Sequence, residues 1–174
     1  MQKRPNATTF KGSPLTLVGP ELKPGDKAPD FTCLNGLELL TLAGTPAKAR
    51  LFSAVPSLDT PVCSLETKKF NEALAALKDK VAAYTISLDL PFAQARFCTE
   101  ANIDNLKNLS DAHDKSFGEH YGVLIQDLPI PLLARAVIVV DPSDTIQYIE
   151  IVPEIATEPN YEPALAALKK ASGS

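Results

Sequence analysis

The stretch Pro56–Cys63 constrains the fold of this chain more than any other, because the sequence changes periodicity across it. The apolar run Leu51–Val55 comes directly before it and is typical of a buried strand. Apolar residues at helical spacing, from Phe70 to Leu77, come after it. The sequence therefore predicts a strand, a short loop and a helix, with one cysteine near the start of the helix.

The residues around Cys63 suit the first turn of that helix. Asp59 or Thr60 can serve as the N-cap, and Pro61 fits the first turn because its missing N–H would have had no partner there. Cys63 then lies among free backbone N–H groups at the positive end of the helix dipole, which stabilises an anion. Because that environment favours the nucleophilic thiolate, we expect Cys63 to be reactive.

The alternative for any cysteine is a structural role, because unpaired cysteines are usually buried and behave as small hydrophobic residues. We interpret Cys33 in this way, since it lies in the strand-like run Asp30–Leu34. For Cys98, on the helix after the next strand, both interpretations stay open. It is either a packed helix residue beside Phe97 or the partner that closes a disulfide with oxidised Cys63.

A cationic group stands at the head of the strongest predicted strand, Ala134–Val140. Arg135 is costly to hold there, near a core, without an anionic partner. A surface carboxylate would serve, and so would a Cys63 thiolate, because the guanidinium stays charged and offers several donors in one plane. Both partners are consistent with the sequence.

The composition is that of one ordinary globular domain over residues 1–174, with 45% hydrophobic residues to form a core. The net charge of −4 and the scattered basic residues exclude an electrostatic footprint for nucleic acid. No segment approaches the roughly 18 apolar residues of a membrane span, and polar residues follow Met1–Arg4, so neither a membrane segment nor a secretory signal is expected.

The cysteine and histidine content excludes two further kinds of site. Three widely spaced cysteines do not make a secreted disulfide framework, which favours a cytoplasmic location by default. There is no Cys-x-x-Cys motif, and His113 and His120 lack close cysteine partners, so we expect no metal site. We interpret both histidines as surface or capping groups, and we expect the small polar tail 171–174 to fray.

Strands alternate with helices along the chain, which predicts an α/β layered fold. The turn at 141–144 is short, so the last two strands must be antiparallel and the sheet mixed. This order is that of the thioredoxin-like fold, here with an N-terminal β-hairpin and helices flanking a central sheet, although periodicity alone leaves several other mixed α/β folds open. The expected strands are Thr8–Lys11, Leu15–Val18, Phe31–Leu34, Leu37–Leu42, Arg50–Ala54, Val81–Ser87, Leu106–Ser110, Ala134–Val140 and Thr145–Val152. The expected helices run from the Cys63 segment to about Leu77, from Asp89 to about Ala101, over Lys115–His120 and over Tyr161–Lys170.

Four segments resemble one known family over nearly the whole chain. Pro56–Cys63 resembles the active-site motif of the peroxiredoxins, in which proline and threonine precede the peroxide-reacting cysteine. Asp89–Cys98 resembles the resolving-cysteine segment of one branch, the bacterial thiol peroxidases, which are atypical two-cysteine peroxiredoxins. Ala134–Val137 is similar to the arginine strand of the family, and Thr157–Tyr161 to the approach to its last helix.

The resemblance implies a role for each candidate residue. Cys63 would be the peroxidatic nucleophile and Cys98 the resolving cysteine, joined in the catalytic cycle by an intrachain Cys63–Cys98 disulfide. Thr60, Pro56 and Arg135 would form the supporting pocket. The implied activity is reduction of hydrogen peroxide and organic hydroperoxides without a cofactor, with thioredoxin as the reductant and a homodimer as the assembly.

Leu128–Leu133 departs from the family pattern, because this proline-rich apolar loop lies where glycines are more usual. The departure bears on the rim of the pocket and on the preferred peroxide. Two other functions are weighed against a peroxidase. A disulfide reductase would want the absent Cys-x-x-Cys motif, whereas a redox sensor or a structural protein could use the same cysteine pair. Because a disulfide needs Cα atoms about 4.4–6.8 Å apart, we expect both helices to unwind locally around the cysteines.

Overall fold

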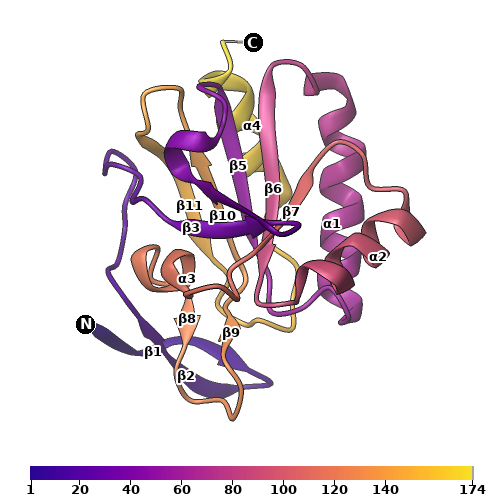
Figure 1. Ribbon diagram of the computed structural model, residues 1–174. Coiled ribbons are helices and arrows are strands. Elements are labelled where there is room, and N and C mark those ends of the chain that lie inside the picture. Colours follow the sequence, from indigo (N-terminus) through magenta and orange to yellow (C-terminus); the bar gives the residue numbers. More distant parts are fainter. Residues whose placement is uncertain (174) are drawn as a thin grey trace.

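A central mixed sheet of seven strands and a smaller sheet of four strands form the framework of the molecule (Figure 1). The computed structural model describes residues 1–173, and Ser174 lies outside the described residues. Along the central sheet the strands are β11 (Ile146–Ile151), β10 (Ala136–Val140), β5 (Ala49–Ala54), β6 (Val81–Ser87), β7 (Lys107–Ser110), β3 (Thr32–Asn35) and β4 (Glu38–Thr41). Along the smaller sheet they are β1 (Lys3–Phe10), β2 (Ser13–Val18), β8 (Leu124–Ile125) and β9 (Leu132–Leu133).

The helices are α1 (Pro61–Leu74), α2 (Pro91–Ala101), α3 (Ser116–His120) and α4 (Tyr161–Ala171), with short 3-10 turns at Leu42–Gly44 and Ala75–Leu77. No helix within residues 1–173 is both long and apolar enough to cross a membrane. Strands β5, β6 and β7 are parallel to one another, whereas β10 is antiparallel to β5 and to β11. The short 141–144 turn therefore produces the antiparallel pair expected from the sequence.

Both faces of the central sheet are covered, which explains why every residue of β5 and β10 is buried. Side chains alternate between the faces of a strand, so Leu51 packs with Phe70 of α1 and Leu168 of α4, whereas Phe52 packs in the aromatic cluster of the opposite face. Helix α1 buries one stripe at helical spacing, comprising Cys63, Glu66, Thr67, Phe70 and Leu74. This packing fixes α1, and with it Cys63, against the sheet.

Three local features differ from the sequence-based expectations. The N-terminal hairpin is longer than expected and turns at Lys11–Gly12, where both φ values are positive (49° and 84°), as a tight hairpin turn requires. The expected strands Phe31–Leu34 and Leu37–Leu42 left residues 35 and 36 for the second turn, but the chain turns at Gly36–Leu37, because Asn35 pairs with Glu38. Gly36 has a φ of 64° and occupies the first central position of the turn, where glycine adopts a positive φ without strain.

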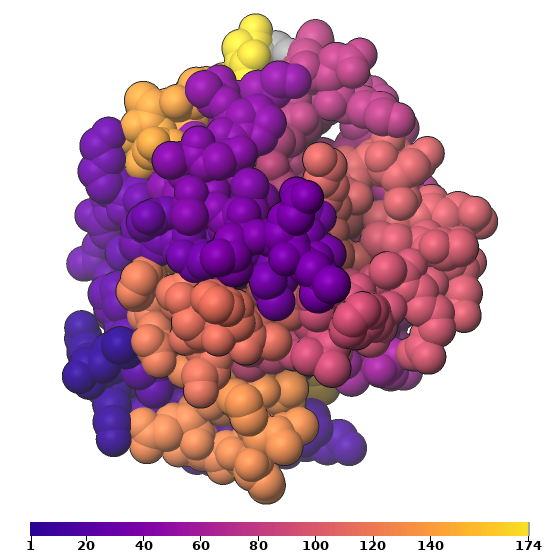
Figure 2. All heavy atoms as spheres, viewed as in Figure 1, coloured from indigo at the N-terminus to yellow at the C-terminus, as the bar shows by residue number. Residues whose placement is uncertain are grey.

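The third difference is the pair of short strands β8 and β9, which were not expected from the sequence. Leu17 pairs with Ile125 and Val18 with Leu124, which attaches the N-terminal hairpin to the 124–133 segment. In Figure 2 the orange atoms of this segment cover the lower end of the molecule, beside the indigo atoms of the hairpin. The proline-rich loop thus connects β8 to β9, and its last two residues, Leu132 and Leu133, belong to the sheet.

At the C-terminus, α4 ends at Ala171, and the Ser172 amide still donates to the Leu168 carbonyl. Fraying of the last residues stays a prediction, because Ser174 lies outside the described residues.

Candidate active site

Cys63 lies in the first turn of α1, directly beyond the carboxyl end of β5. Thr60 occupies the N-cap position and Pro61 the first helical position, as the sequence suggests. Helix geometry leaves the N–H groups of the first turn without intrahelical partners, so the amides of Val62 and Cys63 are free to bind an anion. The Cys63 side chain is fully buried and packs with Val55 and Leu58.

Arg135 directs its guanidinium at the Cys63 sulfur. Its Nη2 donates to Cys63 Sγ at 3.3 Å, and both Arg135 and Cys63 are at most 2% exposed. Nε and Nη2 also donate to the Ile155 carbonyl, at 3.0 and 2.7 Å. Of the two partners open to Arg135 from the sequence, the thiol is therefore present. The contact places a fixed positive charge beside the sulfur at a buried position.

The sequence reasoning missed a third member of this cluster, Glu66. Its carboxylate is fully buried, accepts a hydrogen bond from Ser53 Oγ at 3.1 Å and lies 3.6 Å from Arg135 Nη1. Burial raises the pKa of Glu66 to about 8, against the opposing effect of Arg135. At neutral pH the neutral form is therefore favoured, which leaves the Arg135 charge available to Cys63.

The loop before α1 is anchored by Asp89, from the segment that carries the second candidate cysteine. Asp89 Oδ1 accepts from Ser57 Oγ at 2.7 Å, and Oδ2 accepts from the Leu58 amide and from Ser87 Oγ, each at 2.8 Å. A single carboxylate thus joins the Cys63 loop to the start of α2. From the sequence, Asp89 was expected only as the first residue of that segment.

A largely apolar pocket of about 230 Å³ opens beside Arg135. Among its lining residues are three of the expected ones: Pro56, Thr60 and Arg135. The rim includes Leu128 and Leu132, so the atypical proline-rich segment does shape the pocket. Phe10, Pro61, Val62, Ile155 and Ala156 complete it.

The Thr60 hydroxyl does not contact Cys63 and donates instead to the Ser57 carbonyl at 2.8 Å. Its lone pairs remain able to accept a hydrogen bond from a bound hydroxyl group. Pro56 is buried two residues beyond the end of β5 and lines the pocket. These placements give Thr60 and Pro56 supporting positions around the pocket.

Cys98 lies half-buried on α2, away from Cys63. Its sulfur accepts a hydrogen bond from Asn108 Nδ2 at 2.7 Å and packs beside the cluster formed by α1, α4 and the central sheet. Burial raises the pKa of the Cys98 thiol, although Asn108 acts in the opposite direction. All three cysteines are within the described residues and are free thiols. The neighbouring Phe97 packs against Val55, Leu58 and Cys63, so its ring is the contact between α2 and the surroundings of Cys63.

Cys33 is a core residue on β3, as expected. It is fully buried, and its thiol donates to Asp111 Oδ1 at 3.6 Å. Burial, together with the Asp111 carboxylate, raises the pKa of the Cys33 thiol, which disfavours the reactive thiolate. Asp111 also accepts from the amides of Phe117 and Gly118, so the pair ties β3 to the start of α3.

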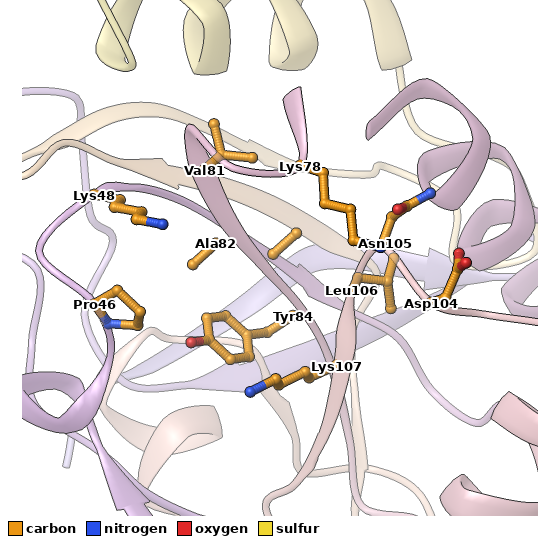
Figure 3. A pocket seen from close by; sticks show the side chains of 11 residues that line it. Pro46, Lys48, Lys78, Val81, Ala82, Tyr84, Asp104, Asn105, Leu106 and Lys107 are labelled. Atoms are coloured by element: carbon orange, nitrogen blue, oxygen red, sulfur yellow. The ribbon is translucent and has the colours of Figure 1, made fainter. Parts of the chain in front are cut away.

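The remaining polar groups do not form a second site for this chemistry. His120 Nδ1 contacts the Asp30 carbonyl at 2.6 Å, and within residues 1–173 no cluster of His, Cys, Asp and Glu side chains is suited to hold a metal. A hollow of about 280 Å³ shown in Figure 3 is lined by Lys48, Lys78 and Lys107 around Tyr84. It lies at the amino ends of β5, β6 and β7, and thus at the opposite end of these strands from Cys63.

Comparison with known proteins places the chain in a family. A family model described as redoxin matches residues 23–165. The thiol peroxidases of Halalkalibacterium halodurans and Bacillus subtilis are each 52% identical to this chain, over 164 and 162 residues. The matches cover 94% and 92% of this chain and 97% and 95% of the relatives. The chain belongs to the thiol peroxidases of the redoxin family.

Solved structures of this family share the fold. A peroxiredoxin-like protein from Aquifex aeolicus is 43% identical to this chain and matches with a TM-score of 0.89 over 95% of this chain and 97% of that one. A thiol peroxidase from Chromobacterium violaceum is only 20% identical but matches with a TM-score of 0.85 over the same shares, which supports the fold alone. The thioredoxin-like fold with a central mixed sheet is confirmed.

Proposed function

We propose that this thiol-dependent peroxidase reduces hydrogen peroxide and organic hydroperoxides at Cys63, with Cys98 as the resolving cysteine. The observation that carries the proposal is the 3.3 Å contact between Arg135 Nη2 and Cys63 Sγ in the first turn of α1. It joins a nucleophile, a fixed cation and free amides beside a pocket. These are the parts that cleavage of a peroxide bond requires.

In the first step, the Cys63 thiolate attacks one peroxide oxygen and the O–O bond breaks. The leaving oxygen takes up a proton and departs as water or an alcohol, and Cys63 becomes a sulfenic acid, the first and reversible stage of thiol oxidation. The sulfur is oxidised by two electrons and the peroxide is reduced by two. No cofactor takes part in this balance.

Ionisation of the thiol alone cannot supply the catalysis. Full ionisation of an ordinary thiol gains only about 30-fold at pH 7, or roughly 2 kcal/mol. The larger share must come from groups that orient the peroxide and stabilise the departing oxygen. Arg135 and the free amides of Val62 and Cys63 are suited as donors, and Thr60 as an acceptor for the peroxide hydroxyl.

The lining of the pocket supports organic hydroperoxides as substrates in addition to hydrogen peroxide. Apart from Thr60 and Arg135, its lining residues are apolar, among them Phe10, Leu132 and Ile155. An alkyl or aryl group bound there would leave water, which favours binding in proportion to the apolar area buried.

In the second step, Cys98 attacks the sulfenic sulfur, water leaves, and an intrachain disulfide forms. Cys63 is fully buried, and Cys98 is held by Asn108. Formation of the bond therefore requires local unwinding of α1 and α2 around the two cysteines. An external dithiol then reduces the disulfide, and we propose thioredoxin for this role.

We further propose that residues 1–174 act as a single domain, that two copies form a homodimer, and that the protein works in the cytoplasm. The dimer and thioredoxin follow from the family resemblance, and sedimentation of the purified chain would test the dimer. Cysteines that must cycle between thiol and disulfide suit a reducing compartment.

The test of the function is oxidation of NADPH in the presence of thioredoxin, thioredoxin reductase and a hydroperoxide. We expect steady turnover by the wild type and none by Cys63→Ser, because a serine hydroxyl is not ionised at neutral pH. Cys33→Ser is the matched control and should retain nearly full turnover. Turnover by Cys63→Ser would contradict the assignment of the nucleophile, and no turnover by the wild type would favour a sensor or a structural protein.

A further inference from the structure

The guanidinium of Arg135 is aimed by a single backbone carbonyl. Both Nε and Nη2 donate to the oxygen of Ile155, and the same Nη2 then reaches Cys63 Sγ. A planar guanidinium held at two of its nitrogens has its direction fixed by that acceptor. The orientation of the Ile155 carbonyl therefore sets where Arg135 points.

The Ile155 carbonyl belongs to the peptide unit that joins Ile155 to Ala156. The N–H of this unit donates to Glu154 Oε2 at 2.9 Å. In a planar trans peptide the C=O and N–H are locked in opposite directions. By holding the Ala156 amide, the Glu154 carboxylate consequently holds the carbonyl that receives Arg135.

The other carboxylate oxygen of Glu154 binds the N-terminal hairpin. Glu154 Oε1 accepts from Thr9 Oγ1 and from the Gly12 amide, each at 2.9 Å. Backbone bonds reinforce the attachment, since Thr9 donates to the Pro153 carbonyl at 2.8 Å and Ile155 donates to the Thr9 carbonyl at 2.9 Å. Glu154 thus lies between the hairpin turn and the peptide that aims Arg135.

We propose that Glu154 is a positioning residue for the peroxidase reaction, which fixes the Ile155–Ala156 peptide on the N-terminal hairpin and so holds Arg135 against Cys63. This inference rests on the proposed function of Arg135. Glu154 is not itself among the residues that line the pocket, and it acts through the Ile155–Ala156 peptide that it holds.

A carboxylate is the group this position needs, because three donors converge on its two oxygens: the amides of Gly12 and Ala156 and the Thr9 hydroxyl. These hydrogen bonds lower the pKa of Glu154 to about 2, with the Gly12 amide as the largest cause. Glutamine has the same shape but brings an NH₂ group, which would face one of these donors. Glu154→Gln thereby removes one half of the bridge while keeping the side-chain volume.

The test is the second-order rate of Cys63 oxidation by hydrogen peroxide, followed by rapid mixing of the reduced full-length chain. Glu154→Gln should lower this rate by about fivefold, because Arg135 loses its fixed direction. Formation of the Cys63–Cys98 disulfide afterwards should keep its wild-type rate, since Arg135 acts before it. Glu38→Gln, an exposed glutamate on β4 at the far edge of the central sheet, is the matched control and should behave as wild type.

A double-mutant cycle separates positioning from a general structural effect. In an Arg135→Lys background the guanidinium that Glu154 aims is gone, so Glu154→Gln should cause no further loss. An equal loss in both backgrounds would overturn the inference, and so would an Arg135-intact Glu154→Gln chain that reacts at the wild-type rate. A wild-type chain whose Cys63 does not react with peroxide would instead overturn the proposed function.

Discussion

Glu66 and Cys63 share the same arginine, and the protonation state of Glu66 decides how the charge of Arg135 is used. A carboxylate 3.6 Å from Nη1 would draw the guanidinium toward itself, whereas a neutral carboxyl leaves it to the sulfur at 3.3 Å. Burial favours the neutral form of Glu66. The burial of Glu66 thus weakens its competition with Cys63 for the guanidinium.

The raised pKa of Glu66 predicts how stability depends on pH. Between the ordinary pKa of 4.5 and the folded value of about 8, the unfolded chain loses this proton while the folded chain keeps it. The folded state then binds more protons, so the free energy of unfolding falls as pH rises through that window. Glu66→Gln should remove this fall, so that its stability relative to wild type increases from pH 5 to pH 8. Urea unfolding at several pH values measures the difference, and a constant difference would contradict the assignment.

Part of this cluster could be predicted from the sequence. Arg135 at the head of a buried strand required an anionic partner, and the Cys63 thiol was one of two candidates. The other candidate, a surface carboxylate, is wrong, because the carboxylate that neighbours Arg135 belongs to Glu66, which is fully buried. Glu66 carried a signal that the sequence reasoning did not use. It lies three residues after Cys63 and four before Phe70, on the buried stripe of α1, where a charged residue is exceptional.

At the scale of elements, most strands and helices were predictable, including the short β3, β4, β7 and α3, whereas the two-residue strands β8 and β9 were not. The buried strands β5, β6 and β10 and helices α1, α2 and α4 occur close to their expected positions. Strands β8 and β9 have two residues each and pair only because the N-terminal hairpin lies beside them. No local sequence pattern therefore predicts them. The turn at Gly36 differs by one residue, because cross-strand pairing decided the register.

The proposed resolving role of Cys98 requires helix α2 to open. In the reduced chain the Ile103 amide donates to the Cys98 carbonyl, and Asn108 binds the Cys98 sulfur. Both contacts conflict with a bond to Cys63, so the end of α2 should open in the disulfide form. Hydrogen exchange of the Phe97–Ala101 amides should be at least about tenfold faster after oxidation, while the β10 amides keep their protection. Equal protection of α2 in both redox states would show that the disulfide forms without unwinding.

At the scale of the whole molecule, the site depends on segments far apart in the chain. The nucleophile comes from α1, the arginine from the head of β10, the loop anchor Asp89 from the start of α2, and part of the pocket from the N-terminal hairpin. Single residues of this set were accessible from motifs. The contacts between these residues could not be predicted, because a backbone acceptor such as the Ile155 carbonyl does not depend on the residue type.

In the proposed mechanism, peroxide oxidises Cys63, and Cys98 of the same chain then forms a disulfide with it. Peptide mapping by mass spectrometry of the chain treated with one equivalent of hydrogen peroxide tests it most directly. We predict a linked pair of peptides that contain Cys63 and Cys98, with Cys33 still a free thiol and no bond between chains. In Cys98→Ser the linked pair should be absent, and Cys63 should carry a sulfenic acid that a dimedone-type reagent traps. Cys63 joined to Cys33, or to a cysteine of a second chain, would contradict the account.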